Sequence, residues 1–259
     1  MTATGVGGLF DLPGRVAIVT GSSRGIGRAI AEGFARAGAR VVITSRNLDA
    51  AQPIAQGIAN AGGEALAQPL EAGDLAQIDA LIRHTVERFG GLDILVNNAA
   101  ILRPHNIEKL TEAEFDELYR VNVKSAVFLA QRALPHLAAS GHGVVINLTA
   151  VGAHAPMAGI GAYCSTKAAM INWTRVMARE WGPRGVRVNA LTPGPVATDM
   201  ILPRDADARA AFVRDLSSQT LLGRVAQPAE MVGPALFLAS DASSFMTGQV
   251  LVVDGGMLA

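Results

Sequence analysis

Short runs of apolar residues, rich in valine and isoleucine, recur along the chain between longer segments with helical spacing. These runs do not alternate between apolar and polar residues, as a strand with one face in water would. They therefore predict parallel strands that are covered on both faces. The six predicted strands are residues 16–20, 40–44, 94–96, 144–148, 186–191 and 249–253.

The segments between these runs have recognisable helix ends. One predicted helix ends at Gly38, another starts with the capping box Thr111-x-x-Glu114, and a third starts at Pro228. Strand and helix alternate throughout. This order predicts an α/β fold in which a doubly wound parallel sheet is flanked by helices and binds ligands beyond the carboxyl ends of its strands.

No repeat, low-complexity tract or long linker divides the chain, so we expect residues 1–259 to form a single domain. Residues 1–10 are expected to be flexible. The least regular stretch, residues 192–225, contains prolines and a short helix rich in alanine and arginine. Its position late in the sheet indicates a lid over the substrate.

Composition and charge narrow the possible partners. The chain has 22 basic and 22 acidic residues and no basic run, which argues against nucleic acid or an anionic membrane surface as a partner. Its single cysteine, Cys164, cannot form an internal disulfide. With no export signal and no apolar stretch long enough to span a membrane, we expect a cytoplasmic protein.

A glycine-rich segment joins the first predicted strand to the first predicted helix. It reads Thr20-Gly21-Ser22-Ser23-Arg24-Gly25-Ile26-Gly27. Small residues let the backbone approach a ligand closely, and the free N–H groups of a helix N-terminus attract an anion. The segment predicts a site for a dinucleotide pyrophosphate, and the alternative is a strand-to-helix turn without a ligand.

The residues after the second strand indicate which dinucleotide binds. About 20 residues beyond the glycines, where an NAD site has a carboxylate for the ribose 2′-hydroxyl, the chain has Ser45 and Arg46. Arg46, with Ser45 and Arg24, is suited to a 2′-phosphate. The sequence therefore predicts NADP(H), and the alternative is that these arginines only face solvent.

Two further patterns carry candidate chemistry. Tyr163 and Lys167 lie four residues apart in a helical segment, so both side chains project from one face, and we expect the ammonium to lower the pKa of the phenol. Asn122 lies on the apolar face of another predicted helix, together with Phe115 and Leu129. A buried amide needs partners, which a neighbouring backbone or a catalytic site can supply.

Together these patterns resemble the short-chain dehydrogenase/reductase family over nearly the whole chain. The family's glycine loop, its NNAG sequence (here Asn97-Asn98-Ala99-Ala100), its helix asparagine, its YxxxK pair and its PG sequence all have counterparts here. The resemblance implies a Rossmann-like fold, a carbonyl reductase or alcohol dehydrogenase activity, and commonly a homotetramer. The cofactor-binding residues implied by the loop and by the family are Gly21, Ser23, Arg24, Gly25, Ile26, Gly27, Ser45, Arg46, Glu71, Ala72, Asn98, Ala99, Ala100, Tyr163, Lys167, Pro193, Gly194, Val196 and Thr198.

The resemblance also implies catalytic roles. Tyr163 would donate a proton to the substrate carbonyl, Lys167 would also contact the nicotinamide ribose, and Asn122 would hold a water that links the lysine to solvent. Two cofactor positions depart from the family. Ala100 replaces a glycine, and Glu71 stands where an aspartate usually meets the adenine amino group.

A third departure affects the substrate side. The family's serine, which hydrogen-bonds the substrate oxygen, corresponds here to Ala150, which has no hydroxyl. Thr149 is adjacent, but neighbouring side chains of an extended backbone point to opposite faces, so it would substitute only at a kinked strand end. Losing one such donor typically costs ~10²–10³ in rate.

The predicted function is NADPH-dependent reduction of a ketone to a secondary alcohol, with Ala150 and His154 at the substrate. The five histidines show no metal-ligand spacing, so no metal is expected. Two alternatives stay open: a cofactor-binding sensor or assembly protein that has lost catalysis, and a reductase of the same family that acts on an imine.

Overall fold

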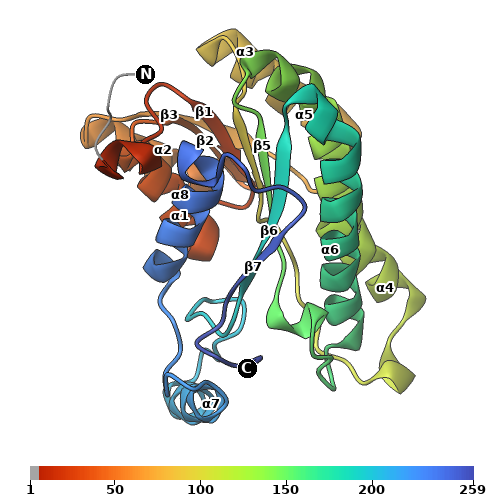
Figure 1. Cartoon of the computed structure of the whole chain (residues 1–259). Coiled ribbons are helices and arrows are strands. Elements are labelled where there is room, and N and C mark those ends of the chain that lie inside the picture. Colours follow the sequence, from red (N-terminus) through yellow and green to blue (C-terminus); the bar gives the residue numbers. More distant parts are fainter. Residues whose placement is uncertain (1–5) are drawn as a thin grey trace.

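A computed structural model describes residues 6–259 and contains one seven-stranded parallel sheet with the order β3-β2-β1-β4-β5-β6-β7 (Figure 1). The order in which the chain adds strands to the sheet reverses between β1 and β4, which are neighbours. The predicted doubly wound α/β fold is confirmed. The strands are β1 (Val16–Val19), β2 (Arg40–Ser45), β3 (Glu64–Pro69), β4 (Ile94–Asn97), β5 (Val144–Leu148), β6 (Arg187–Pro193) and β7 (Val250–Val253).

Helices cover both faces of the sheet. On one face, α1 (Gly25–Arg36), α2 (Leu48–Asn60) and α8 (Val232–Ala239) pack their buried residues against the strands. On the other face lie α3 (Leu75–Phe89), α5 (Ser125–Ser140) and α6 (Gly161–Trp181) (Figure 1). The remaining helices are α4 (Glu112–Tyr119), α7 (Ala206–Ser218), the π-helix Arg120–Lys124 and the short 3-10 helices Val6–Phe10, Ile107–Lys109, Val151–Ala153, Gly182–Arg184, Pro228–Met231 and Asp241–Ser243.

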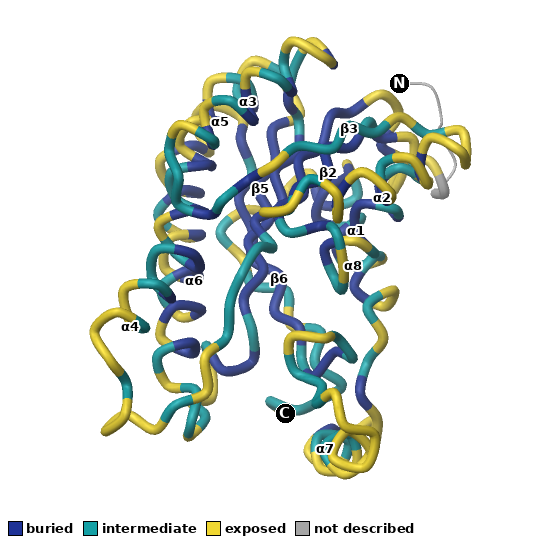
Figure 2. Tube along the Cα trace, turned by 180° about the vertical axis from the view of Figure 1, so that it is seen from behind, coloured by how far each residue is buried: buried dark blue, intermediate teal, exposed yellow. Residues whose placement is uncertain are grey.

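The central strands are buried along their whole length, as the continuous apolar runs predicted. Every residue of β1, β4 and β5 is buried, and Figure 2 shows the middle of the sheet in the colour of buried residues. Burial of valine and isoleucine side chains on both faces contributes about 1.5–3 kcal/mol per side chain, which makes this sheet a rigid support. Its carboxyl ends carry the candidate site.

The edge strand β3 was missed in the sequence. Its residues, Glu-Ala-Leu-Ala-Gln-Pro, are exposed or only half buried. Its only large aliphatic residue is Leu66, so it lacks the valine-rich or isoleucine-rich run that identified the other six, including β7 at the opposite edge.

Several predicted helix ends are confirmed. Thr111 and Glu114 form the expected capping box of α4, and Pro228 begins a 3-10 turn that leads into α8. One prediction was wrong in detail. The helical face that joins Phe115 to Leu129 does not belong to one regular helix, because a π-helical turn at Arg120–Lys124 separates α4 from α5. Such turns insert an extra residue and are frequent at functional sites.

The stretch 192–225, expected to form a lid, contains the end of β6 and the helix α7. No residue of α7 is buried, and the helix lies beyond the carboxyl edge of the sheet, apart from the other helices (Figure 1). Its role as a lid stays a prediction. So does the flexibility of residues 1–10, of which 1–5 lie outside the described residues.

Among residues 6–259, no helix has both the length and the apolar character needed to cross a bilayer.

Candidate active site

A cleft of about 390 Å³ lies at the carboxyl edge of the sheet, between the start of α1 and the start of α6. It brings together residues from the ends of six of the seven strands, from the π-helix and from the stretch 192–225. The predicted residues that line it are Gly21, Ser23, Arg24, Gly25, Ile26, Ser45, Arg46, Glu71, Ala72, Asn98, Ala99, Ala100, Tyr163, Lys167, Pro193 and Thr198.

The glycine loop is shaped by close packing against the end of β4. A Cβ on Gly21 would lie 3.0 Å from the Cα of Ala99, and Gly21 has a φ of +62°. A Cβ on Gly27 would lie 2.4 Å from the Nδ2 of Asn98, which donates to the carbonyl of Thr20 at 2.8 Å. Gly21 therefore lines the cleft, whereas Gly27 lies behind its wall and allows helix and loop to pack closely.

The first turn of α1 opens onto the cleft. No described side chain caps this helix, whose N-cap residue is Arg24, and Gly25 and Ile26 of its first turn line the cleft. Uncapped N–H groups at a helix N-terminus, with the positive end of the helix dipole, favour a bound anion. The loop therefore fits a pyrophosphate group.

The end of β2 supplies the cationic side chain expected for a 2′-phosphate. Ser45 and Arg46 both line the cleft, and Arg46 is exposed. Arg24 is also exposed, and its guanidinium is 3.9 Å from the carboxylate of Asp199. Both arginines are therefore at the cleft, but Arg24 has a carboxylate beside it.

Arg120, which the sequence did not single out, contacts Glu71 and Ala72 just after the end of β3. Arg120 Nη1 lies 3.3 Å from Glu71 Oε1 and also donates to the carbonyl of Ala72. The carboxylate that was expected to meet an adenine amino group is thus paired with a guanidinium.

Tyr163 and Lys167 lie one turn apart near the start of α6 and face the same cleft. Tyr163 is 9% exposed and Lys167 only 3%. Lys167 Nζ donates to the carbonyl of Leu148, at the end of β5, at 2.8 Å and lies 5.7 Å from the centre of the Tyr163 ring. The strand end and the helix therefore hold the ammonium beside the phenol.

Burial controls the protonation of this pair. It raises the pKa of Tyr163 above its usual range, with a smaller contribution from the neighbouring Cys164, and it lowers the pKa of Lys167 to about 8. The expectation that Lys167 lowers the pKa of Tyr163 does not hold in this arrangement. The cost of burying the phenolate exceeds the attraction of an ammonium that is bonded to a carbonyl instead.

Asn122 lies in the π-helix, and its side chain is fully engaged. Its Oδ1 accepts from the Ile101 amide at 2.8 Å, and its Nδ2 donates to the Ile101 carbonyl at 3.0 Å and to Thr166 Oγ1 at 3.1 Å. The amide ties the segment after β4 to α6. These are the partners that a buried asparagine needs.

Known proteins resemble this chain over nearly its whole length. The family model described as enoyl-(acyl carrier protein) reductase matches residues 21–258. The gluconate 5-dehydrogenase of Gluconobacter oxydans is 40% identical over 255 residues, which cover 96% of this chain and 96% of that protein. The chain belongs to the short-chain dehydrogenase/reductase family. The resemblance read from the sequence is confirmed.

Other relatives agree in fold. The crystal structure of a gluconate 5-dehydrogenase from Burkholderia cenocepacia in complex with NADP and tartrate superposes with a TM-score of 0.90 at 38% identity, covering 96% of this chain and 97% of that one. A short-chain type dehydrogenase/reductase from Mycobacterium marinum has a TM-score of 0.91 at 34% identity, covering 98% and 99%. The 3-oxoacyl-[acyl-carrier-protein] reductase of Vibrio cholerae is 36% identical, covering 96% and 99%. All three are named as dehydrogenases or reductases.

The substrate side differs from the family pattern at the strand end. Ala150, which replaces the family's serine, has extended backbone angles (φ −162°, ψ 159°) and packs against the apolar cluster of Leu118, Tyr163 and Cys164. Thr149 is buried, and its hydroxyl bonds the Leu191 carbonyl and Thr192. Thr149 lines the cleft whereas Ala150 does not, but the Thr149 hydroxyl is engaged by β6. Its use as a replacement donor stays a prediction.

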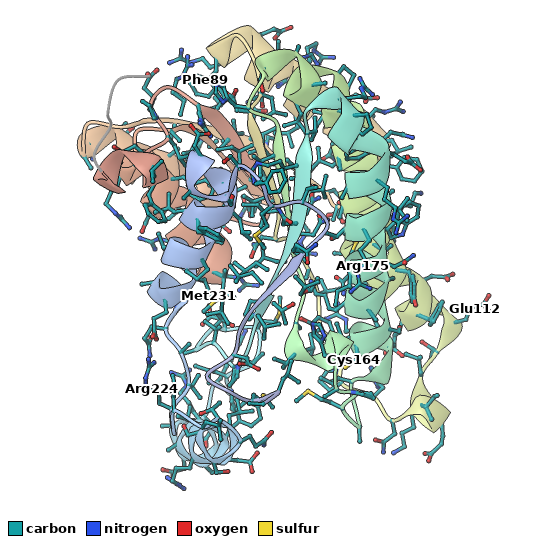
Figure 3. All side chains as sticks on the ribbon, viewed as in Figure 1. Phe89, Glu112, Cys164, Arg175, Arg224 and Met231 are labelled. Atoms are coloured by element: carbon teal, nitrogen blue, oxygen red, sulfur yellow. The ribbon has the colours of Figure 1, made fainter. Side chains whose placement is uncertain are left out.

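His154 and Cys164 have neighbours that bear on their roles. His154 is exposed, and its Nε2 lies 3.5 Å from Thr192 Oγ1. Cys164 is buried on α6 (Figure 3), in contact range of Gly152, where a Cβ would lie 2.6 Å from its Sγ. This close contact supports a packing role for the cysteine.

Some predicted residues stand behind the cleft rather than in its wall. Gly194 packs on the backbone of Asp254, 2.6 Å from where its Cβ would be, and Val196 is buried and pairs with Ala226. Asn122, Ala150 and His154 are likewise absent from the described lining, as is Gly27.

Other lining residues were missed in the sequence. They are Thr44, Ala50, Leu70, Ile101, Glu117, Arg120, Val121, Leu148 and Asp199. Thr149, considered in the sequence as a substitute donor, and Met200 also line the cleft. Thr44 and Leu148 lie at or next to the carboxyl ends of predicted strands, so the rule that ligands bind at strand ends would have identified them. Glu117, Arg120 and Val121 come from α4 and the π-helix, where nothing in the residue pattern indicates a cleft.

Proposed function

We propose that this chain is an NADPH-dependent oxidoreductase that reduces a ketone to a secondary alcohol, reversibly, with Tyr163 as proton donor. The observation that carries the proposal is the placement of Tyr163 and Lys167 one turn apart in the same cleft as an uncapped helix N-terminus. The cleft thus joins a proton donor to an anion-binding loop. Family membership supports the reaction type.

The residues at the cleft fit NADP(H). The Gly21 loop and the start of α1 would hold the pyrophosphate, and Ser45 and Arg46 would hold the 2′-phosphate. A similar gluconate 5-dehydrogenase has been crystallised with NADP, which supports this assignment. When bound, NADPH supplies the hydride.

The residues of the chain account for the proton. The raised pKa of Tyr163 keeps the phenol protonated at neutral pH, while an alkoxide forming on the substrate is more basic still, so the proton moves from Tyr163 to the substrate oxygen. The phenolate left behind is buried. Lys167, whose pKa of about 8 leaves it mostly charged at pH 7, compensates that negative charge and favours the transfer.

Asn122 is the proposed link to solvent. Its side-chain amide already donates both protons, to Ile101 and Thr166, so a bound water would use the backbone of the π-helix, where carbonyls lose their usual helical partners.

A non-catalytic cofactor-binding protein is the second candidate, because Ala150 lacks the family's hydroxyl. An imine substrate is the third, since reduction of an imine depends less on that hydroxyl. A screen of NADPH oxidation against ketones, sugars, quinones and imines distinguishes the three. Turnover of a ketone supports the proposal, turnover of imines alone favours the third candidate, and NADPH binding without any turnover favours the second.

A further inference from the structure

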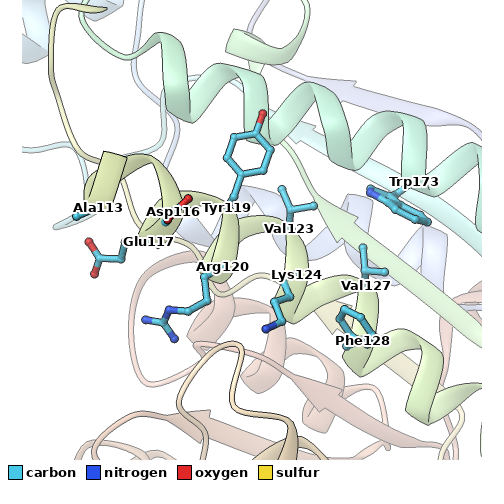
Figure 4. A pocket seen from close by; sticks show the side chains of 10 residues that line it. All are labelled: Ala113, Asp116, Glu117, Tyr119, Arg120, Val123, Lys124, Val127, Phe128 and Trp173. Carbon is cyan, nitrogen blue, oxygen red and sulfur yellow. The ribbon is translucent and has the colours of Figure 1, made fainter. Parts of the chain in front are cut away.

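Arg120 occupies an unusual position between the two ends of the candidate site. It is the first residue of the π-helix, two residues before Asn122, and its side chain reaches the loop after β3. There it bonds the Glu71 carboxylate through Nη1 and Nη2, at 3.3 and 3.4 Å, and the Ala72 carbonyl. In Figure 4, the Arg120 and Lys124 side chains project from the same side of this segment, away from Tyr119.

The loop after β3 is fitted to this arginine. Gly73 has a φ of +83°, and a Cβ there would lie 2.8 Å from Arg120 Cγ and 3.2 Å from the Arg120 carbonyl. A larger residue at position 73 would displace the arginine. The contact therefore joins two segments 49 residues apart in sequence by packing as well as by charge.

Glu71 and Arg120 form part of the cleft wall. Across the sheet, β3, which precedes Glu71, is separated from β5, which precedes Tyr163, by three strands. Glu71, Ala72 and Arg120 all line the cleft, together with Leu70 and Arg46. The pyrophosphate loop follows β1 and Tyr163 follows β5, whereas Arg46 follows β2 and Leu70, Glu71 and Ala72 follow β3, on the other side of β1. Arg120 reaches these residues from the π-helix after β4. This is the adenosine end of the proposed cofactor site.

We propose that Arg120 is a cofactor-binding determinant at the adenosine end, acting as a unit with Glu71. The proposal rests on the proposed use of NADP(H). Arg120 holds the loop after β3 in place and neutralises a carboxylate that would otherwise lie beside a cofactor carrying several negative charges. Both effects favour binding, and neither requires a 2′-phosphate on the dinucleotide.

Binding of 2′,5′-ADP tests this directly, because the compound contains the adenosine end of NADP and no nicotinamide. We expect Arg120→Gln to weaken binding of 2′,5′-ADP by about 3- to 10-fold, as measured by calorimetry. Adding Glu71→Gln should restore part of the loss, since it removes the unpaired carboxylate. If the affinity loss of the double variant equals the product of the losses of Arg120→Gln and Glu71→Gln alone, the idea that the pair acts as a unit is overturned.

The dinucleotides provide a second readout that is independent of turnover. Arg120→Gln should weaken both NADPH and NADH, whereas Arg46→Ala should weaken only NADPH. A loss for Arg120→Gln that is confined to NADPH would assign Arg120 to the 2′-phosphate and overturn the proposal.

Arg132→Gln is the matched control. Arg132 pairs with Asp79 at 3.1 Å with side chains 45% and 52% exposed, close to the 40% and 39% of Arg120 and Glu71, but it lies outside the cleft lining. We expect this variant to change 2′,5′-ADP affinity by less than about twofold. Equal affinities for Arg120→Gln, Arg132→Gln and the native chain would overturn the proposal. A native chain that binds neither 2′,5′-ADP nor NADPH would overturn the cofactor assignment as well.

Discussion

Replacing Lys167 by methionine is expected to change how the stability of the protein depends on pH. The side chain is only 3% exposed, and burial lowers its pKa from 10.5 to about 8. At pH 7 the native protein therefore keeps an ammonium in a site that disfavours charge. With these two values, the penalty is about 3 kcal/mol at pH 7.

The sign follows from proton counting. Between about pH 8 and 10.5 the unfolded chain holds a proton on Lys167 that the folded chain has lost. Stability rises with pH wherever the unfolded state binds more protons, so the native chain gains stability through this window. The methionine variant has no such group. The free energy of unfolding of the native chain, minus that of Lys167→Met, should rise by about 2–3 kcal/mol from pH 7 to pH 10.

Urea unfolding at pH 7, 8, 9 and 10 measures this difference, with fluorescence of the buried Trp181 as the probe. The variant also lacks the hydrogen bond to the Leu148 carbonyl, which lowers its free energy of unfolding by the same amount at every pH. The other titrating groups are present in both proteins, so their contributions cancel in the difference. A difference that stays constant within about 0.5 kcal/mol, or that falls with pH, would refute the reasoning.

Three further predictions concern the substrate side, the cofactor and the assembly. Ala150→Ser should raise ketone turnover, by up to ~10²–10³ if a donor to the forming alkoxide is restored, with little change in NADPH affinity. Thr149→Val should cost little turnover, because the Thr149 hydroxyl bonds Leu191 and Thr192; a large loss there, with no gain from Ala150→Ser, would show that Thr149 is the donor. Arg46→Ala should abolish a preference for NADPH over NADH, measured by fluorescence titration, and a native chain with equal affinities would remove the assignment to NADP(H). We expect a homotetramer by light scattering, since β7 is a sheet edge with the exposed Val252, and a monomer at micromolar concentration would rule it out.

The strands that could be predicted are those with a continuous run of apolar residues. Val16–Val19 and Val144–Leu148 are covered on both faces, so apolar side chains are required at every position. Glu64–Pro69, at one edge, has a single large aliphatic residue and was missed, whereas Val250–Val253, at the other edge, keeps an apolar run and was found. Local patterns with a direct physical cause, such as the capping box of Thr111 and Glu114, were found for the same reason.

The candidate site was predictable where a short sequence forms it and not where distant segments meet. The glycine loop and the Tyr163–Lys167 pair each lie within one turn or loop, so spacing alone brings their residues together. Arg120, at the π-helical turn between α4 and α5, reaches Glu71 across 49 residues. Neither the turn nor the contact has a periodic pattern. The raised pKa of Tyr163 likewise depends on burial among segments that the spacing does not specify.

The central claim, that Tyr163 donates the proton in an NADPH-dependent reduction, is tested most directly by Tyr163→Phe. The phenyl ring keeps the packing with Leu118 and Cys164 but lacks the hydroxyl. With a ketone that the native chain reduces, the account predicts that the variant binds NADPH as tightly as the native chain and turns over at least ~100-fold more slowly. A variant that reduces the ketone at the native rate would contradict the account.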